Sequence, residues 1–185
     1  MSQAPVKVLS SHIVYSNRYI AAHADVLSKS GRQWEQAYVT KPHPEHDVVV
    51  VPYENGGVYL LNQYRHANTG YFWQFPGGSG EDEQSSDEVA LRELNEETGL
   101  IAGKLRMIGQ TCAEPGLVRL KTTIYVATDL THGKQHFEHS EIGMKVAFFT
   151  LSKIEEMIRS GEIMCGFTLA AWLFFRTYLF ENQKK

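Results

Sequence analysis

The segment Asp47–Tyr53 (DVVVVPY) constrains the fold of this chain more than any other part of the sequence. Its continuous apolar run is typical of a strand that is buried on both faces of its sheet. We expect helices at Asp87–Thr98, Leu151–Ser160 and Phe167–Phe180. Further strands are expected at Val58–Tyr64, Leu105–Thr111, Lys121–Thr128 and Met144–Phe149. Strands mixed with helices in this way predict an α/β sandwich.

The first forty residues predict a small β-rich subdomain. Alternating and β-branched or aromatic residues indicate strands at His12–Tyr15, Tyr19–Leu27 and Gln33–Thr40, with a hairpin turn between the last two. Two prolines in Lys41–Glu45 (KPHPE) then break the pattern, because proline removes a ladder hydrogen bond. We place the boundary there and expect a β subdomain at residues 1–45 and the main domain at residues 46–185.

Length and composition exclude several classes of protein. The 185 residues carry a net charge of −3, which argues against a protein that neutralises nucleic-acid phosphates. Two cysteines are too few for a disulfide-dense secreted scaffold, so we expect a reduced, cytoplasmic protein. The apolar stretch Phe167–Phe180 is interrupted by Arg176 and is shorter than the roughly 18 residues that a membrane span needs. We therefore expect neither a membrane nor a nucleic-acid partner.

The segment RELNEETGL, residues 92–100, lies at the end of the first expected helix. Positions i, i+3 and i+4 share one face of a helix, so one patch holds the carboxylates of Glu93, Glu96 and Glu97. Like charges this close repel unless a cation neutralises them, and hard ions such as Mg²⁺ or Mn²⁺ prefer oxygen ligands. Taken alone, a glutamate-rich helix face is more often simply solvated.

Start and stop signals bound this helix. Ser85 and Glu88 have the spacing of a capping box, and Gly99 suits the left-handed position that ends a helix. The glycine-rich segment Pro76–Gly80 precedes the helix. Because glycine has no side chain, this segment allows the backbone to approach a ligand closely and to offer it a carbonyl or an amide.

The joint pattern from Gly78 to Leu100 resembles the motif of the Nudix hydrolase family. That motif is a glycine, five residues, a glutamate, seven residues, then Arg-Glu-apolar-any-Glu-Glu-any-Gly-apolar. Every signature position fits except the isolated glutamate, where this chain has Gln84, with Glu81 and Glu83 nearby. The resemblance implies an α/β/α sandwich with a mixed sheet, and hydrolysis of a nucleoside diphosphate that is linked to another group X.

The resemblance also implies roles for single residues. Glu93 and Glu97 would be the main ligands of Mg²⁺, or of Mn²⁺ in its place, joined by the carbonyl of Gly77. Glu96 would be a further metal ligand or a partner of the ligands. Arg92 would orient the glutamates through charge-assisted hydrogen bonds rather than touch the substrate. The metal would clamp the diphosphate and activate a water.

Three features resemble the branch of the family that cleaves ADP-ribose and other nucleoside diphosphate sugars. They are Gln63–His66 followed by Trp73–Gly78, the proline at position 115, and the N-terminal β-rich segment. In that branch the N-terminal sheet exchanges contacts within a homodimer and helps to bind the base. The chain departs from the branch at Gln74, at Gly77, and at positions 117–119, where an acidic residue is usual.

Three side chains are candidates for contact with the substrate. Arg65 and Arg32 suit phosphate or ribose oxygens, and Trp34 suits stacking on a base. The plain alternative for each arginine is a solvated surface position. For Trp34 it is packing in a core or an interface.

The loop His132–Glu141 (HGKQHFEHSE) has two interpretations. In the resembling branch, a loop at this place supplies an acidic residue as general base or as a ligand of a third metal. Glu141 is our first choice for this role and Glu138 our second. The rival interpretation is a zinc site built from histidines of the loop, but their spacing fits no tight zinc motif.

Three functions are therefore compared. The leading one is metal-dependent hydrolysis of nucleoside diphosphate sugars, with ADP-ribose as the first choice and ADP-glucose or GDP-mannose as rivals. The second keeps the chemistry but changes X to a dinucleoside polyphosphate or another nucleotide, as the Gln-Phe-Pro-Gly-Gly turn favours. The third is a nucleotide sensor that has lost catalysis, for which Gln84 is the only motif feature.

Overall fold

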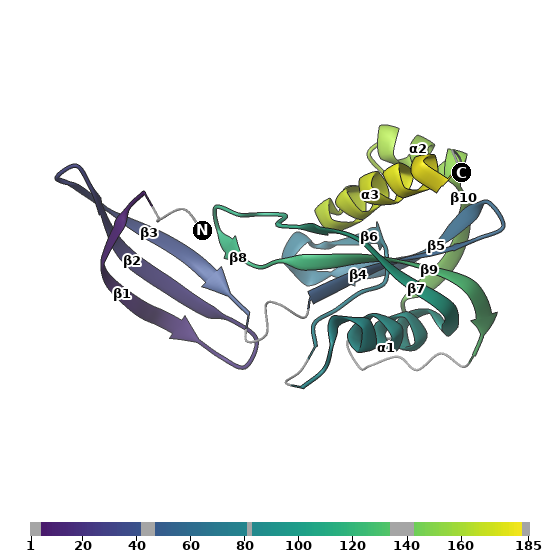
Figure 1. Cartoon of the computed structure of the whole chain (residues 1–185), viewed down its shortest axis with the longest axis horizontal. Coiled ribbons are helices and arrows are strands. Elements are labelled where there is room, and N and C mark those ends of the chain that lie inside the picture. Colours follow the sequence, from purple (N-terminus) through teal and green to yellow (C-terminus); the bar gives the residue numbers. More distant parts are fainter. Residues whose placement is uncertain (1–4, 42–46, 81–82, 134–142, 183–185) are drawn as a thin grey trace.

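The computed structural model describes residues 5–41, 47–80, 83–133 and 143–182, and it contains two sheets and three α-helices. Figure 1 shows a thin N-terminal sheet that projects from a larger layered body. In chain order the strands are β1 (Lys7–Ser16), β2 (Ala21–Lys29), β3 (Arg32–Thr40), β4 (Asp47–Glu54), β5 (Gly57–Arg65), β6 (Gly70–Gln74), β7 (Leu100–Thr111), β8 (Val118–Arg119), β9 (Thr122–His132) and β10 (Lys145–Thr150). The helices are α1 (Ser86–Thr98), α2 (Leu151–Arg159) and α3 (Gly166–Asn182), with a short 3₁₀ turn at His66–Asn68.

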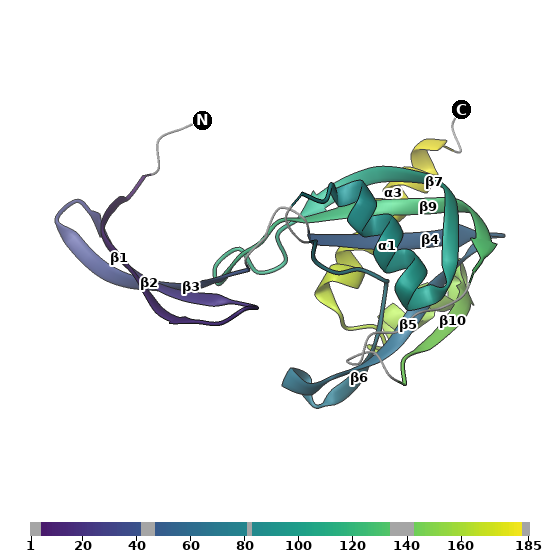
Figure 2. The same cartoon turned by 90° about the horizontal axis from the view of Figure 1, so that it is seen from below.

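The N-terminal sheet has the strand order β1-β2-β3-β8. The first three strands pair antiparallel, and the turn between β2 and β3 places Ser30 and Gly31 at φ 53° and 78°. These positive angles suit a tight hairpin turn. The two-residue strand β8 joins β3 in parallel. Both views show this sheet standing apart from the body, to which β8 connects it (Figures 1 and 2).

The body contains a six-stranded mixed sheet in the order β10-β5-β4-β9-β7, with β6 paired to β5. Strands β4 and β9 run parallel at its centre, and the other pairs are antiparallel. Residues 47–52 of β4 are buried, as expected for a strand covered on both faces. The predicted α/β sandwich with a mixed sheet and a small N-terminal β sheet is therefore confirmed.

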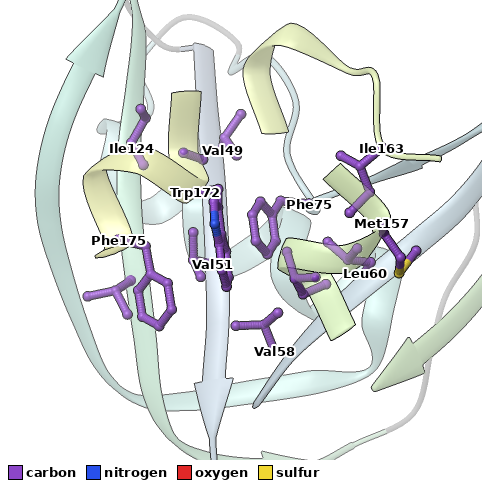
Figure 3. Packing of buried hydrophobic residues seen from close by; sticks show 13 residues of the cluster. Val49, Val51, Val58, Leu60, Phe75, Ile124, Met157, Ile163, Trp172 and Phe175 are labelled. Atoms are coloured by element: carbon purple, nitrogen blue, oxygen red, sulfur yellow. The ribbon is translucent and has the colours of Figure 1, made fainter. Parts of the chain in front are cut away.

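Alternate residues of β4 belong to two separate cores. Val48 and Val50 pack with Val89, Ala90 and Leu94 of α1 on one face. The opposite face packs against α2 and α3, and Figure 3 shows this cluster, which contains Val49, Val51, Val58, Leu60, Phe75, Ile124, Val126, Ile154, Met157, Ile163, Ala171, Trp172 and Phe175. Because successive side chains of a strand point to opposite faces, the apolar strand β4 packs against the helices on both sides of the sheet.

The sequence signals at the ends of α1 are confirmed. The Ser85 side chain accepts a hydrogen bond from the Glu88 amide, and the Glu88 side chain accepts one from the Ser85 amide. Gly99 ends the helix at φ 71° in the left-handed region. This reciprocal cap fixes where the helix starts, and therefore which of its residues face the sheet.

Several strands differ from the sequence prediction: β1 begins at Lys7 rather than His12, and β9 ends at His132 rather than Thr128. The aromatic strand β6 and the two-residue strand β8 were not expected, and β7 begins at Leu100 rather than Leu105. The first residues of β7 are strand because they pair with the end of β9, a contact between distant segments that local sequence does not reveal. Within the described ranges, no helix has the length and apolar character to cross a membrane.

Candidate functional site

Two glutamates of α1 are buried although they are charged. The exposed fractions of Glu93 and Glu97 are 8% and 3%. They lie one helical turn apart, next to Val89 and Leu94, which face the sheet. A carboxylate is removed from water at high cost unless hydrogen bonds or a cation compensate it. The groups that contact Glu93 and Glu97 therefore show how their burial is compensated.

The segment Pro76–Gly78 runs along β4 and faces both glutamates. The carbonyls of Pro76 and Gly78 accept hydrogen bonds from the Val50 and Val48 amides, each at 2.9 Å. In an extended segment the N–H and the carbonyl of one residue point to the same side, and neighbouring residues alternate. Gly77 therefore directs both groups away from β4, and its N–H donates to Glu97 Oε2 at 2.8 Å.

Neither glycine of this pair leaves room for a side chain. A Cβ on Gly77 would collide with the backbone of β4, at 3.0 Å from the Val49 Cα. A Cβ on Gly78 would collide with the Glu93 carboxylate, at 2.6 Å from its Cδ and 2.9 Å from its Oε2. The absence of side chains is thus what allows the Glu93 carboxyl group to lie directly against the chain.

Arg92 organises the carboxylates from the side. Its Nη2 donates to Glu93 Oε1 at 2.8 Å and to the Ser79 carbonyl at 3.3 Å, and its Nη1 donates to Glu96 Oε2 at 2.7 Å. Burial alone would lower the pKa of Arg92, but the carboxylates of Glu93 and Glu96 outweigh burial and raise it. Arg92 therefore stays charged and holds two of the three glutamates in fixed orientations.

The carboxylates suit a hard divalent ion, with one restriction. Among the described residues, no three His, Cys, Asp or Glu side chains converge as a metal cage, and Glu96 points to Arg92. Mg²⁺ is commonly held by one or two carboxylates together with water and substrate phosphates, rather than by an all-protein cage. Buried Glu93 and Glu97 offer two such carboxylates, and the backbone of Gly77 contacts Glu97 directly.

A cavity of about 200 Å³ borders the glycine segment. Its lining includes Gly77, Gly78, Gln74 and two cations, Arg65 and Lys41. Arg65 Nε donates to Gln74 Oε1 at 3.1 Å, and Gln74 in turn donates to the buried Gln63 at 2.7 Å. The structure thus places Arg65 in the lining of the same cavity as Gly77 and Gly78, whereas Glu93 and Glu97 do not line this cavity.

Lys41 was missed by sequence reasoning, which treated it as the start of the linker. It follows the end of β3, and it lines the same cavity as Arg65 and Gly77. The only available signal was its basic side chain beside the boundary of the subdomain. A single lysine in a proline-rich connection does not predict a place in a cavity.

The other predicted substrate residues lie elsewhere in this chain. Arg32 and Trp34 belong to β3 near its hairpin with β2, and Trp34 is 39% exposed. The hairpin end of this sheet is remote from α1 in both views (Figures 1 and 2). One chain therefore does not bring Arg32 or Trp34 to its own glutamates. Glu138 and Glu141 lie outside the described residues.

Comparisons with known proteins identify the domain family of this chain. The model of the NUDIX domain matches residues 43–164. An ADP-ribose pyrophosphatase of Mycobacterium tuberculosis is 25% identical over 94% of this chain and 84% of its own length. An ADP-sugar pyrophosphatase of Mus musculus is 33% identical over 65% of this chain and 60% of its own. The crystal structure of an ADP compounds hydrolase superposes with a TM-score of 0.84, covers 98% of both chains and is 21% identical, which supports the fold.

Proposed function

The chain belongs to the NUDIX domain family of hydrolases, and on this premise we propose that it hydrolyses the diphosphate of nucleoside diphosphate sugars with a divalent metal. The products are a nucleoside monophosphate and a sugar phosphate. ADP-ribose is the first substrate to test, and ADP-glucose and GDP-mannose follow. Relatives named as pyrophosphatases of ADP-ribose and ADP-sugars support this choice of substrate class.

One observation carries the proposal: Glu93 and Glu97 are buried against Gly77 and Gly78. Two carboxylates in a low-dielectric site are unfavourable by themselves, because burial and mutual repulsion both oppose their ionised forms. A divalent cation removes both penalties. Mg²⁺, with Mn²⁺ as a substitute, would supply charge neutralisation on the phosphoryl oxygens and a more acidic bound water.

The remaining tasks belong to side chains of the protein. Glu93 and Glu97, with the Gly77 carbonyl, would hold the cation. Arg92 keeps Glu93 and Glu96 in place through its two hydrogen bonds, so these carboxylates do not reorganise during the reaction. Arg65 would contact a phosphate or ribose oxygen of the substrate, and its place in the lining of the cavity beside Gly77 supports this role.

We propose that an acidic residue of the segment after β9 accepts the proton. Glu141 is the first choice as general base or ligand of a third metal, and Glu138 is the second. Single and double Glu→Gln variants at these positions test the assignment. If the double variant keeps a near-normal rate, the base lies elsewhere.

The N-terminal sheet is proposed to act in a homodimer. Strand β1 exposes apolar side chains, among them Ile13 with 63% of its surface accessible, and the single four-stranded sheet has no second layer to bury them. A second copy would cover this surface. Residues 1–45 would then bring Arg32 and Trp34 to the site of the partner chain, where Trp34 would stack on the base.

A substrate panel tests the function directly. Phosphate release after phosphatase coupling is measured with ADP-ribose, ADP-glucose, GDP-mannose and diadenosine polyphosphates, with Mg²⁺ and with chelator. We expect turnover that needs metal and is concentrated on the sugar nucleotides. Turnover of the diadenosine polyphosphates instead would support the same metal site with a different substrate class. This is the alternative that the turn Gln74–Gly78 favours. Tight binding without turnover would support the nucleotide sensor.

A further inference from the structure

Asp47 is a buried carboxylate that the proposed chemistry does not use. It is the first residue of β4, and 6% of its surface is exposed. Its Oδ1 accepts hydrogen bonds from Lys41 Nζ and from Ser79 Oγ, the latter at 2.7 Å. Its Oδ2 accepts one from Thr122 Oγ1 at 2.8 Å. One cation and two hydroxyls therefore compensate a charge that would otherwise be costly to bury.

The three donors come from three separate parts of the chain. Lys41 directly follows β3 of the N-terminal sheet, Ser79 belongs to the glycine segment, and Thr122 begins β9. Lys41 Nζ also donates to Ser79 Oγ at 2.9 Å, so these two partners of Asp47 contact one another. Ser79 forms a backbone bridge with Asp47 as well. Asp47 thus links the end of β3 in the N-terminal sheet, the segment Pro76–Gly80 and the central sheet.

Ser79 continues these contacts to α1. Its carbonyl accepts a hydrogen bond from Arg92 Nη2 at 3.3 Å, and the same nitrogen donates to Glu93 at 2.8 Å. The preceding residue, Gly78, lies against the Glu93 carboxylate. A continuous set of polar contacts therefore runs from Lys41 through Asp47, Ser79 and Arg92 to Glu93.

From these contacts we infer that Asp47 is a positioning residue for the metal-binding carboxylates and couples them to the N-terminal sheet. It acts through Ser79, and it lines the same cavity as Lys41, Gly77 and Gly78. When Asp47 holds Ser79, the segment Pro76–Gly80 and Arg92 keep their positions relative to Glu93. Lys41 ties the end of β3 to Asp47 as well. The inference rests on the proposed function only in that Glu93 and Glu97 hold the metal.

The chain offers matched variants for a test. Asp47→Asn removes the charge with little change in shape, and Ser79→Ala removes only the hydroxyl that links Asp47 to the glycine segment. Ser79→Thr restores a hydroxyl and is the conservative rescue. The control is Asp25→Asn, because Asp25 is also buried and accepts a hydrogen bond from Ser11, but it lies within the N-terminal sheet.

Two measurements on the full chain read out the positioning. Mn²⁺ binding is followed by electron paramagnetic resonance without substrate, and hydrogen exchange of the peptides spanning Pro76–Glu93 is followed without metal. We expect Asp47→Asn and Ser79→Ala to weaken Mn²⁺ binding by about 10-fold, the range known for partners of metal ligands, and to speed exchange in these peptides. Ser79→Thr and Asp25→Asn are expected to leave both unchanged.

The outcomes separate this inference from the proposed function. If Asp47→Asn and Ser79→Ala bind Mn²⁺ as tightly as the wild type and exchange no faster, Asp47 does not position the site. An equal effect of Asp25→Asn would overturn the inference too, because the weaker Mn²⁺ binding would then follow from a general loss of stability rather than from the position of Asp47. If the wild type binds no Mn²⁺, the proposed function fails, and the exchange measurement alone then decides whether Asp47 holds the glycine segment. Should Asp47→Asn fail to fold, Ser79→Ala still gives the decision.

Discussion

Replacing Gly78 by alanine is expected to disable the carboxylate site without disturbing the fold. The added Cβ would lie 2.6 Å from the Glu93 Cδ, whereas ordinary contacts begin at 3.4 Å, so the carboxyl group has to move by about 1 Å. The obstacle is the end of a side chain rather than backbone, and Gly78 has no positive φ. The backbone therefore accepts alanine, which also lowers the entropy of the unfolded chain.

A misplacement of about 1 Å at a catalytic group costs a rate factor on the order of 100. We expect kcat on the preferred substrate to fall by about that factor in Gly78→Ala, while the thermal unfolding midpoint stays within a few degrees of the wild type. Gly70→Ala is the matched control, because its Cβ would meet ordinary contacts at 3.5 Å. Gly77→Ala is the contrast: its Cβ would meet β4 backbone, so the fold itself should weaken.

Steady-state kinetics and thermal unfolding of the three variants test whether Gly78 serves the site rather than the fold. A near-normal kcat in Gly78→Ala would refute the argument, because it would mean that the position of Glu93 against the glycine segment is irrelevant to turnover. Unfolding of Gly78→Ala at a much lower temperature would also refute it, since the glycine would then serve the fold rather than the site.

Further predictions concern the metal, the helix cap, alkaline pH and assembly. Glu97→Gln should lower metal-dependent turnover by at least about 100-fold in kinetic assays, since it loses several kcal/mol of charge stabilisation. Ser85→Ala should lower the free energy of unfolding by about 1 kcal/mol in urea titration; no change would mean that the cap is not formed. Burial, with the hydrogen bond to Glu54, raises the pKa of Tyr59 to about 12. The protonated hydroxyl of Tyr59 therefore stabilises the fold below pH 10, and this stabilisation is lost as the pH rises toward 12. Tyr59→Phe should reduce the loss of unfolding free energy between pH 10 and pH 12, measured by unfolding at several pH values. Ile13→Lys should yield a monomer in sedimentation, whereas a wild-type monomer would rule out the dimer.

Sequence patterns predicted those parts of the fold that rest on local signals. The apolar run of β4 required a covered strand, and the pair Ser85 and Glu88 marked the start of α1 to within a residue. Strand β8 was missed because two residues carry no periodicity and are strand only by pairing with β3. Its position depends on the tertiary fold rather than on its own sequence.

The same distinction holds at the candidate site. Helical spacing placed Glu93, Glu96 and Glu97 on one side of α1, but it did not show that Arg92 would bind the carboxylate of Glu96. The contacts of Asp47 join residues that lie up to 75 positions apart, such as Thr122. Contacts of this kind arise from tertiary packing, and no local pattern in the sequence encodes them.

The pairing of β3 with β8 has a consequence for the order of folding. The hairpins of β1, β2 and β3 form between neighbours in the chain, whereas Gln36 meets Gly116 across 80 residues. Closing so long a loop is slow and must follow formation of the body. During synthesis the N-terminal strands therefore emerge first, and β3 gains its partner β8 last. The two register shifts in the edge strand β1 would then protect the nascent chain, since an irregular edge is a poor template for aggregation.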